Sequence, residues 1–203
     1  MVSLQEGLVI AKEQLGLKIY DHHWGSSSIA NLSGVKPQLV DVATLAIRIC
    51  SFDGTVVSGG GLRTQEQADQ NAANGTGVSD SRHLKQSDGF GHAIDCIPLT
   101  PGSGIDWNNI NAFRDMAQAV KTASAILRVP IRQGCDWNIN GIFSEPNESD
   151  WAHFENPKEK YQQAAKIELE RTRKSLGLDE PILPEKNSFR CPVCLAQLNI
   201  TKS

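Results

Sequence analysis

Apolar residues recur at helical spacing in three stretches of this chain, at about residues 4–15, 37–49 and 109–128. The first opens with a capping box that begins at Ser3, and the second begins at Pro37, a residue favoured in the first turn of a helix. An apolar residue at every third or fourth position gives a helix one buried stripe, so each stretch predicts an amphipathic helix. The stripe residues are Leu4, Leu8, Ala11 and Leu15, then Leu39, Val42, Ala46 and Ile49, and finally Phe113, Met116, Val120 and Leu127.

Shorter apolar runs predict strands, at about residues 55–58, 93–97, 130–132 and 153–155, the second of them ended by Pro98. Helices mixed with short strands that do not alternate regularly predict an α+β fold. The remaining expected elements are a helix capped by Thr64 with Gln67 at the capping-box position, a charged helix that starts near Asn156, Pro157 and Glu159 and stops at Gly177, and loops at 21–35 and 75–90.

The composition is that of an ordinary globular chain, with 203 residues, 39% of them hydrophobic and 21% charged, and a formal net charge of -3. This length accommodates one domain and a short appendage, and the charge gives no reason to expect nucleic acid or a membrane surface as a partner. No stretch approaches the roughly 18 apolar residues of a membrane helix. The first residues lack a basic region followed by an apolar run, so we expect no signal peptide and synthesis in the cytoplasm.

The five cysteines do not form an obvious disulfide framework, because their number is odd and three of them, Cys50, Cys96 and Cys135, lie singly in apolar surroundings. Cys191 and Cys194 form a CxxC pair, which is half of a zinc-ribbon pattern without a second pair after it. An accessible dithiol and a second zinc site completed by other residues or by a second chain both stay open. A redox role lacks the thioredoxin-like pattern that would support it.

Two separate segments carry the residues that a catalytic metal ion needs. His83 and Asp95 lie in one segment, and His153 lies in the other. Two imidazoles and one carboxylate make a three-ligand zinc site with an open fourth position, which is typical of metal hydrolases. Asp150, three residues before His153, is placed to act as a general base on whatever fills that position.

These residues and their flanks resemble the M15 peptidases, a group of zinc enzymes that includes the D-alanyl-D-alanine carboxypeptidases. The likeness is greatest to the phage endolysin branch, the L-alanyl-D-glutamate endopeptidases, whose pattern is Ser-x-His-x-x-Gly-x-Ala-x-Asp with a later Asp or Glu three residues before a ligand His. It covers about residues 25–156. The matching segments are Ser81-Arg82-His83, Gly91-His92-Ala93-Ile94-Asp95, Asp150-Trp151-Ala152-His153-Phe154-Glu155, Gly61-Leu62-Arg63-Thr64 with Gln67, Gly34-Val35-Lys36-Pro37-Gln38-Leu39-Val40 and Val129-Pro130-Ile131-Arg132 with Gly134-Cys135-Asp136-Trp137.

The resemblance implies a small antiparallel sheet flanked by helices, in the hedgehog/D,D-peptidase-like zinc peptidase fold. Residues 1–156 would form the catalytic domain, and residues 157–203 a C-terminal helix and a cysteine-containing tail. The protein would be a monomer that binds bacterial peptidoglycan, with no nucleic-acid partner and no membrane anchor. It would stay in the host cytoplasm until lysis brings it to the periplasm and cell wall.

The implied activity is hydrolysis of the L-alanyl-D-glutamate bond in peptidoglycan stem peptides, for lysis of the cell. Zn²⁺ held by His83, Asp95 and His153 would activate a water. Asp150 would take the proton and return it to the leaving amine, and Arg63 would help the metal to stabilise the oxyanion.

Some features depart from the family pattern or leave alternatives open. An extra segment at about residues 86–90 separates the first two ligands. A loop can absorb these residues at small entropic cost.

The roles of three residues stay open. Ser81 would either bind substrate or orient its loop, His92 competes for the metal, and Glu148 competes with Asp150 as the base. A D,D- or L,D-carboxypeptidase of the same fold and a noncatalytic peptidoglycan-binding module are the alternative functions.

Overall fold

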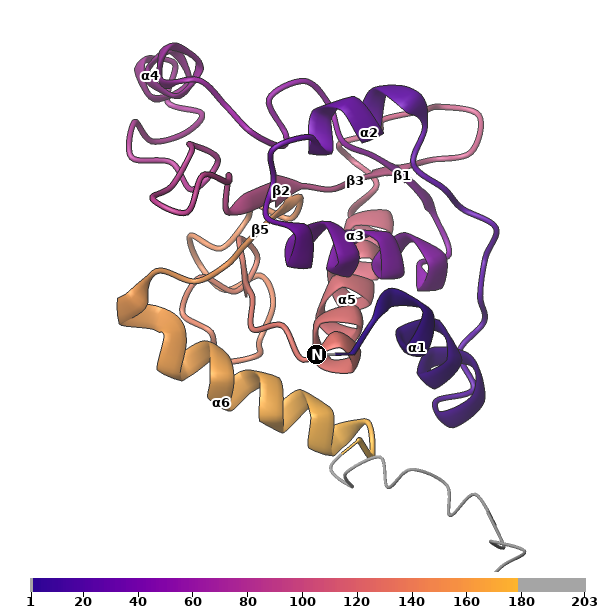
Figure 1. Cartoon of the computed structure of the whole chain (residues 1–203). Helices are drawn as coiled ribbons and strands as arrows, with labels where there is room; N and C mark the ends of the chain where they lie inside the picture. The colour runs from indigo at the N-terminus through magenta and orange to yellow at the C-terminus, as the bar shows by residue number, and fades with distance from the viewer. Residues whose placement is uncertain (1, 179–203) are drawn as a thin grey trace, which may run out of the picture.

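The computed structural model describes residues 2–178, which form helices around two small antiparallel sheets (Figure 1). This mixture confirms the predicted α+β class. The elements are α1 (Leu4–Val9) with its π-helical continuation η1 (Ile10–Gln14), α2 (Ser26–Leu32), α3 (Pro37–Ile49), β1 (Asp53–Thr55), α4 (Gln65–Ala73), β2 (Ala93–Asp95), β3 (Ile97–Leu99), α5 (Ile110–Leu127), β4 (Arg132–Gln133), β5 (His153–Glu155) and α6 (Glu159–Ser175).

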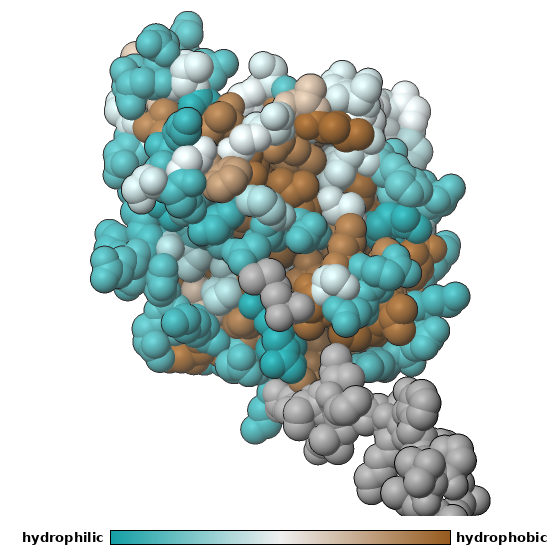
Figure 2. Space-filling view, viewed as in Figure 1, coloured by the Kyte–Doolittle hydropathy of each residue, from teal (hydrophilic) through white to brown (hydrophobic). Residues whose placement is uncertain are grey.

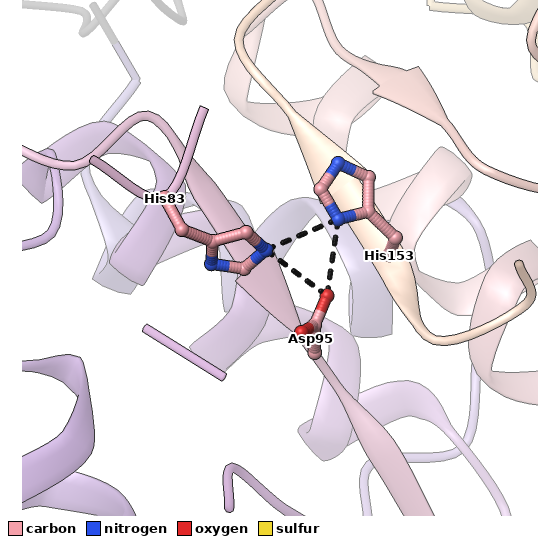
Figure 3. Close-up of side chains that lie close together, drawn as sticks. All are labelled: His83, Asp95 and His153. Carbon is pink, nitrogen blue, oxygen red and sulfur yellow. Dashed lines mark hydrogen bonds and ion pairs between the residues drawn. The ribbon is translucent and has the colours of Figure 1, made fainter. Parts of the chain in front are cut away.

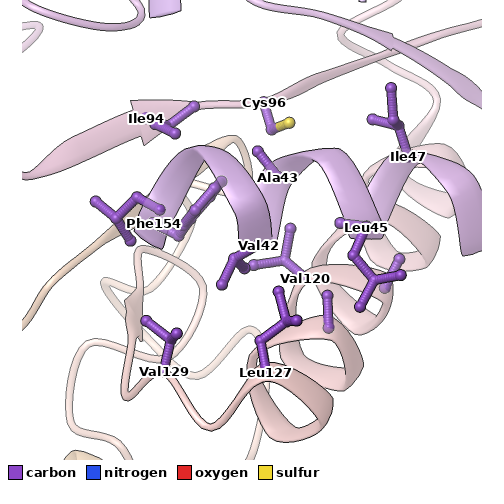
Figure 4. Close-up of a cluster of buried hydrophobic side chains, with 14 of the residues drawn as sticks. Val42, Ala43, Leu45, Ile47, Ile94, Cys96, Val120, Leu127, Val129 and Phe154 are labelled. Carbon is purple, nitrogen blue, oxygen red and sulfur yellow. The ribbon is translucent and has the colours of Figure 1, made fainter. Parts of the chain in front are cut away.

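The main core lies where α3 packs against α5, with α1 beside them (Figure 1). Figure 4 shows Val42 and Leu45 of α3 pointing toward Val120 and Leu127 of α5, and all four side chains are fully buried. Ile94 and Phe154 reach the same cluster from β2 and β5, and Cys96 reaches it from the residue between β2 and β3. The helices therefore follow the apolar stripes in the sequence, because burying those stripes against one another removes them from water.

The five strands form two sheets, one of β1 and β3 and the other in the order β2-β5-β4. The single strand expected at 93–97 is wrong, because Cys96 separates β2 from β3 and the two join different sheets. Pro98 lies inside β3 rather than ending it, opposite Gly54. A two-stranded sheet consists only of edges, where a proline that cannot donate a ladder hydrogen bond is tolerated.

Two other expectations were wrong in part. The loop expected at 21–35 contains the helix α2, whose buried side chains are only Ser28 and Leu32, too short a stripe to show in the sequence. The first strand lies at Asp53–Thr55, two residues before its expected start.

The capping box expected at Thr64 is confirmed. The Thr64 side chain accepts a hydrogen bond from the Gln67 backbone, and the Gln67 side chain accepts one from the Thr64 backbone.

Helix α6 lies against α5 along the lower side of the molecule in Figure 1. Arg173 donates a 2.7 Å hydrogen bond to the Ala125 carbonyl, and Lys121 forms a 2.7 Å ion pair with Glu168. The outer surface in this view is mainly hydrophilic, with apolar side chains showing between the elements (Figure 2). No helix within residues 2–178 is long and apolar enough to cross a membrane. Cys191 and Cys194 lie outside the described residues.

Candidate metal centre

Asp95 and His153 are brought together by the antiparallel pairing of β2 with β5, in which they stand directly opposite each other. The Asp95 Oδ1 and His153 Nδ1 atoms are 3.0 Å apart. Successive side chains on a strand point to opposite faces, so the intervening pair, Ile94 and Phe154, points into the core. The pairing register therefore aims the two polar side chains at the same point outside the core.

His83 reaches this point from the loop that follows α4. Its backbone carbonyl accepts a 2.9 Å hydrogen bond from Arg63, and its backbone N–H donates to the Ser81 hydroxyl at 3.2 Å. The imidazole Nδ1 lies 2.7 Å from the Gly61 carbonyl oxygen. Gly61 itself lies against α2, because a Cβ there would lie 1.9 Å from the Asn31 carbonyl oxygen. The close packing of this glycine therefore fixes the carbonyl that faces His83.

The three predicted ligand side chains converge (Figure 3). His83 Nε2 lies 3.2 Å from Asp95 Oδ1 and 3.2 Å from His153 Nδ1, and the donor atoms all lie within 4.8 Å of one another. Histidine ligands of metals normally engage their second ring nitrogen with a carbonyl or carboxylate, which fixes their orientation. Here that nitrogen faces the Gly61 carbonyl in His83 and, at 3.3 Å, the Glu155 carboxylate in His153. The arrangement fits a metal ion.

The electrostatics of the cluster favour positive charge at its centre. Burial would raise the pKa of Asp95, but His83 and His153 hold it well below its usual range. Burial would lower the pKa of His153, but Asp95 and Glu155 raise it to about 9. Burial likewise opposes ionisation of Glu155, and His153 lowers its pKa. A cation at this point would replace the proton that these carboxylates attract.

Arg63 holds the other side of the Asp95 carboxylate. Its Nη2 lies 2.5 Å from Asp95 Oδ2, and its Nε donates to the Gly59 carbonyl. One carboxylate oxygen thus faces the imidazoles while the other accepts from the guanidinium. An arginine in this position limits rotation of the carboxylate, because the charge-assisted hydrogen bond is directional.

All six predicted site residues line one open cavity of about 450 Å³, namely Arg63, Ser81, His83, Asp95, Asp150 and His153. Asp150 is accessible to solvent inside the cavity, yet the surrounding walls displace much of its hydration and raise its pKa. Its backbone is closely packed, because a Cβ at Gly134 would lie 2.4 Å from the Asp150 carbonyl oxygen.

The structure also adds residues that the sequence reasoning missed. Glu155 lies two residues after His153 on β5, so strand alternation places it on the same face, a signal that was present in the sequence. Trp137 packs beside His153, with ring centroids 5.3 Å apart. Arg132 forms a 3.4 Å ion pair with Glu155 and lies over the Trp137 ring, which only the folded chain could reveal.

The competing residues are engaged elsewhere. His92 Nε2 pairs with Asp88 at 2.8 Å and its Nδ1 lies 2.8 Å from Arg82, so His92 holds the extra segment and does not belong to the ligand cluster. Glu148 is buried and accepts a 2.8 Å hydrogen bond from the Asn138 backbone. Unlike Asp150, it does not line the cavity.

Three comparisons place this geometry in a family. Residues 21–158 match the family model of the phage L-alanyl-D-glutamate peptidases. The L-alanyl-D-glutamate peptidase of Escherichia phage T5 is 37% identical over 126 residues, which cover 60% of this chain and 86% of that protein. The crystal structure of the Serratia marcescens L-Ala D-Glu endopeptidase ChiX matches with a TM-score of 0.54 and 26% identity, over 70% of this chain and 96% of that one. The resemblance seen in the sequence is confirmed, and this chain belongs to the phage L-alanyl-D-glutamate peptidase family.

Proposed function

We propose that this protein is a phage-type endolysin, a zinc-dependent endopeptidase that hydrolyses the L-alanyl-D-glutamate bond of peptidoglycan stem peptides and so lyses the cell. The observation that carries the proposal is the convergence of His83, Asp95 and His153 beside Asp150 in one open cavity. The bond that we propose is cleaved comes from the names of the T5 and Serratia relatives, which are an L-alanyl-D-glutamate peptidase and an L-Ala D-Glu endopeptidase. A mere binding module would not need a carboxylate held next to a metal site.

Two imidazoles and one carboxylate suit Zn²⁺, and His83, Asp95 and His153 would hold it. When bound, such an ion supplies a Lewis acid and an activated water. Glu155 supports this set by accepting from the outer nitrogen of His153, which fixes the ring and makes it a better ligand.

Asp150 acts as the general base and then as the general acid. Its carboxylate takes a proton from the attacking water and returns it to the amine of the departing D-glutamyl fragment. The raised pKa suits the first half of this task, because a carboxylate that binds a proton more tightly is a stronger base. Its exposure within the cavity leaves it accessible to substrate.

Arg63 has two tasks in this proposal. It fixes Asp95 through the 2.5 Å contact, and it lines the cavity, where its remaining N–H groups can donate to the oxyanion that develops on the scissile carbonyl. Ser81 orients the His83 loop through its hydroxyl and also lines the cavity, so it serves as a substrate contact as well.

The catalytic unit in this proposal is residues 1–156, with residues 157–203 as an appended segment. The protein acts as a monomer on the bacterial cell wall, needs no nucleic acid or membrane anchor, and waits in the host cytoplasm until lysis.

Mass spectrometry of purified peptidoglycan digested with and without a chelator tests the proposal. Chelator-sensitive release of fragments that begin with D-glutamate is expected. Release of terminal D-alanine alone would instead indicate a carboxypeptidase. Absence of any product while zinc is bound would indicate a binding module.

A further inference from the structure

The Lys and Arg side chains that line the catalytic cavity, within the part of the chain that the structure describes, are Arg63, Arg82, Arg132 and Lys158. Three of them are committed to the protein itself. Arg63 holds Asp95, and Arg132 pairs with Glu155 and donates to the Trp137 carbonyl. Their positive charges are therefore largely matched inside the wall of the cavity.

Arg82 is committed in the same way. It donates through Nε and Nη2 to the Asn156 carbonyl, at 3.3 and 3.0 Å, and through Nη1 to the Gln86 side chain at 2.8 Å. These contacts tie the His83 loop to the chain just before α6. Releasing this guanidinium to a ligand would break several hydrogen bonds at once.

Lys158 differs from the three arginines. Within residues 2–178, its ammonium group forms a 2.6 Å ion pair with Asp80, and the Asp80 side chain is 92% exposed. The pair joins the loop after α4 to the residue before α6, and both residues line the cavity. Lys158 is half-buried, but its partner is almost fully exposed, and an ion pair at the protein surface contributes only about 0–1 kcal/mol. Lys158 can therefore exchange Asp80 for another anion at little cost.

The substrate class implied by the proposed function supplies such an anion. A D-glutamyl residue has two carboxyl groups, and at most one continues the peptide chain, so at least one stays available as a carboxylate or as its amide. This group lies on the fragment that leaves with the amine. A lysine at the cavity wall is suited to it, because an ammonium ion binds a carboxylate without demanding a fixed approach direction.

We propose that Lys158 recognises the free carboxylate of the substrate's D-glutamyl residue, and that Asp80 occupies Lys158 until the substrate displaces it. The inference rests on the proposed function and adds a specificity device to it. Lys158 makes the enzyme prefer a substrate with a free carboxylate, and Asp80, as a built-in competitor, weakens the binding of every such substrate by the same factor.

The test compares two synthetic stem peptides that differ only in this group, one with the free carboxylate and one with the carboxamide. For the wild type at low ionic strength, we expect a KM about fivefold lower for the acid peptide. Lys158→Gln should raise the KM of the acid peptide to that of the amide peptide. Asp80→Asn should lower the KM of the acid peptide a further two- to fivefold, since its competitor is removed. Added salt should reduce the preference.

Lys160→Gln is the matched control, because Lys160 is two residues away and outside the cavity lining, and it should keep the wild-type preference. Lys158 caps α6 without a side-chain hydrogen bond, so its substitution leaves that helix start intact. Equal loss on both peptides in Lys158→Gln, or an unchanged preference, would overturn the inference while leaving the proposed function in place. Failure of the zinc-loaded wild type to cleave either peptide would overturn both.

Discussion

The two faces of the β2–β5 strand pair differ in what they do. One face carries Ile94 and Phe154, which are almost fully buried against the α3–α5 core (Figure 4). The other carries the opposed pair Asp95 and His153, whose side chains point toward each other (Figure 3) and line the open cavity. A shift of the register by one residue would exchange the two sets, so the hydrophobic core specifies the geometry of the candidate metal site.

The two faces also differ in how they are held. The hydrophobic interactions of the core are non-directional, and their contribution to the free energy of folding grows with the apolar area removed from water. The site face depends on directional polar contacts, such as Arg63 to Asp95 and His83 to the Gly61 carbonyl. We therefore expect substitutions on the core face to change stability first, and substitutions on the site face to change activity first.

The largest expected effect is on the site face. His153→Ala removes a proposed ligand, so metal content should fall and kcat/KM should drop by about three orders of magnitude or more. Metal analysis of the purified variant and peptide hydrolysis measure the two effects. His23→Ala is the control, because its side chain is 64% exposed and lies outside the cluster. Full activity in His153→Ala would remove this residue from the site.

Asp150→Asn should separate chemistry from metal binding. The amide cannot take the proton, so kcat should fall by about 10²- to 10⁴-fold while the metal content stays at the wild-type value. The same change at Asp21, whose side chain is 96% exposed, should have no effect on either quantity. Loss of metal in Asp150→Asn would show instead that Asp150 acts as a ligand.

On the core face, Leu127→Ala should lower the free energy of unfolding by about 2–5 kcal/mol, because it leaves a cavity between α5 and its neighbours. At a temperature where the variant stays folded, kcat/KM should remain near that of the wild type. Ile167→Ala on the exposed side of α6 should change stability by only about 0.5 kcal/mol or less. Denaturant unfolding and peptide hydrolysis measured together would contradict the contrast if Leu127→Ala lost activity first.

The same contrast explains how much of the fold could be predicted from the sequence. The long helices α3 and α5 were predicted because their apolar stripes repeat over three or more turns. Helix α2 was missed because it buries only two side chains. The division of 93–97 into β2 and β3 was missed as well, because it depends on which sheet each half joins.

For the site, the three ligands and Asp150 could be proposed from residue type and spacing, with the family resemblance to connect the segments. Glu155 could have been added from strand alternation alone. The contact of Arg63 with Asp95 and that of Arg132 with Glu155 could not have been predicted. Each joins residues that are far apart in the sequence, and no local sequence pattern indicates it.

The smallest expected effects come from the two capping boxes, which provide a matched pair. Ser3 caps α1, which packs beside the core, and Thr64 caps α4, directly after Arg63. Replacing either with Ala removes a hydrogen bond to the first turn and should cost about 0.5–2 kcal/mol of stability.

Their effects on activity should differ. Ser3→Ala should leave kcat/KM unchanged, because α1 lies on the core side of the molecule. Thr64→Ala loosens the turn that positions Arg63, and Arg63 holds Asp95, so kcat/KM should fall several-fold at the same loss of stability. Thermal unfolding and peptide hydrolysis of the two variants decide the point. Equal activity in both would mean that Gly59 and Asp95 hold Arg63 in place without help from α4, and that the site face tolerates small shifts as well as the core does.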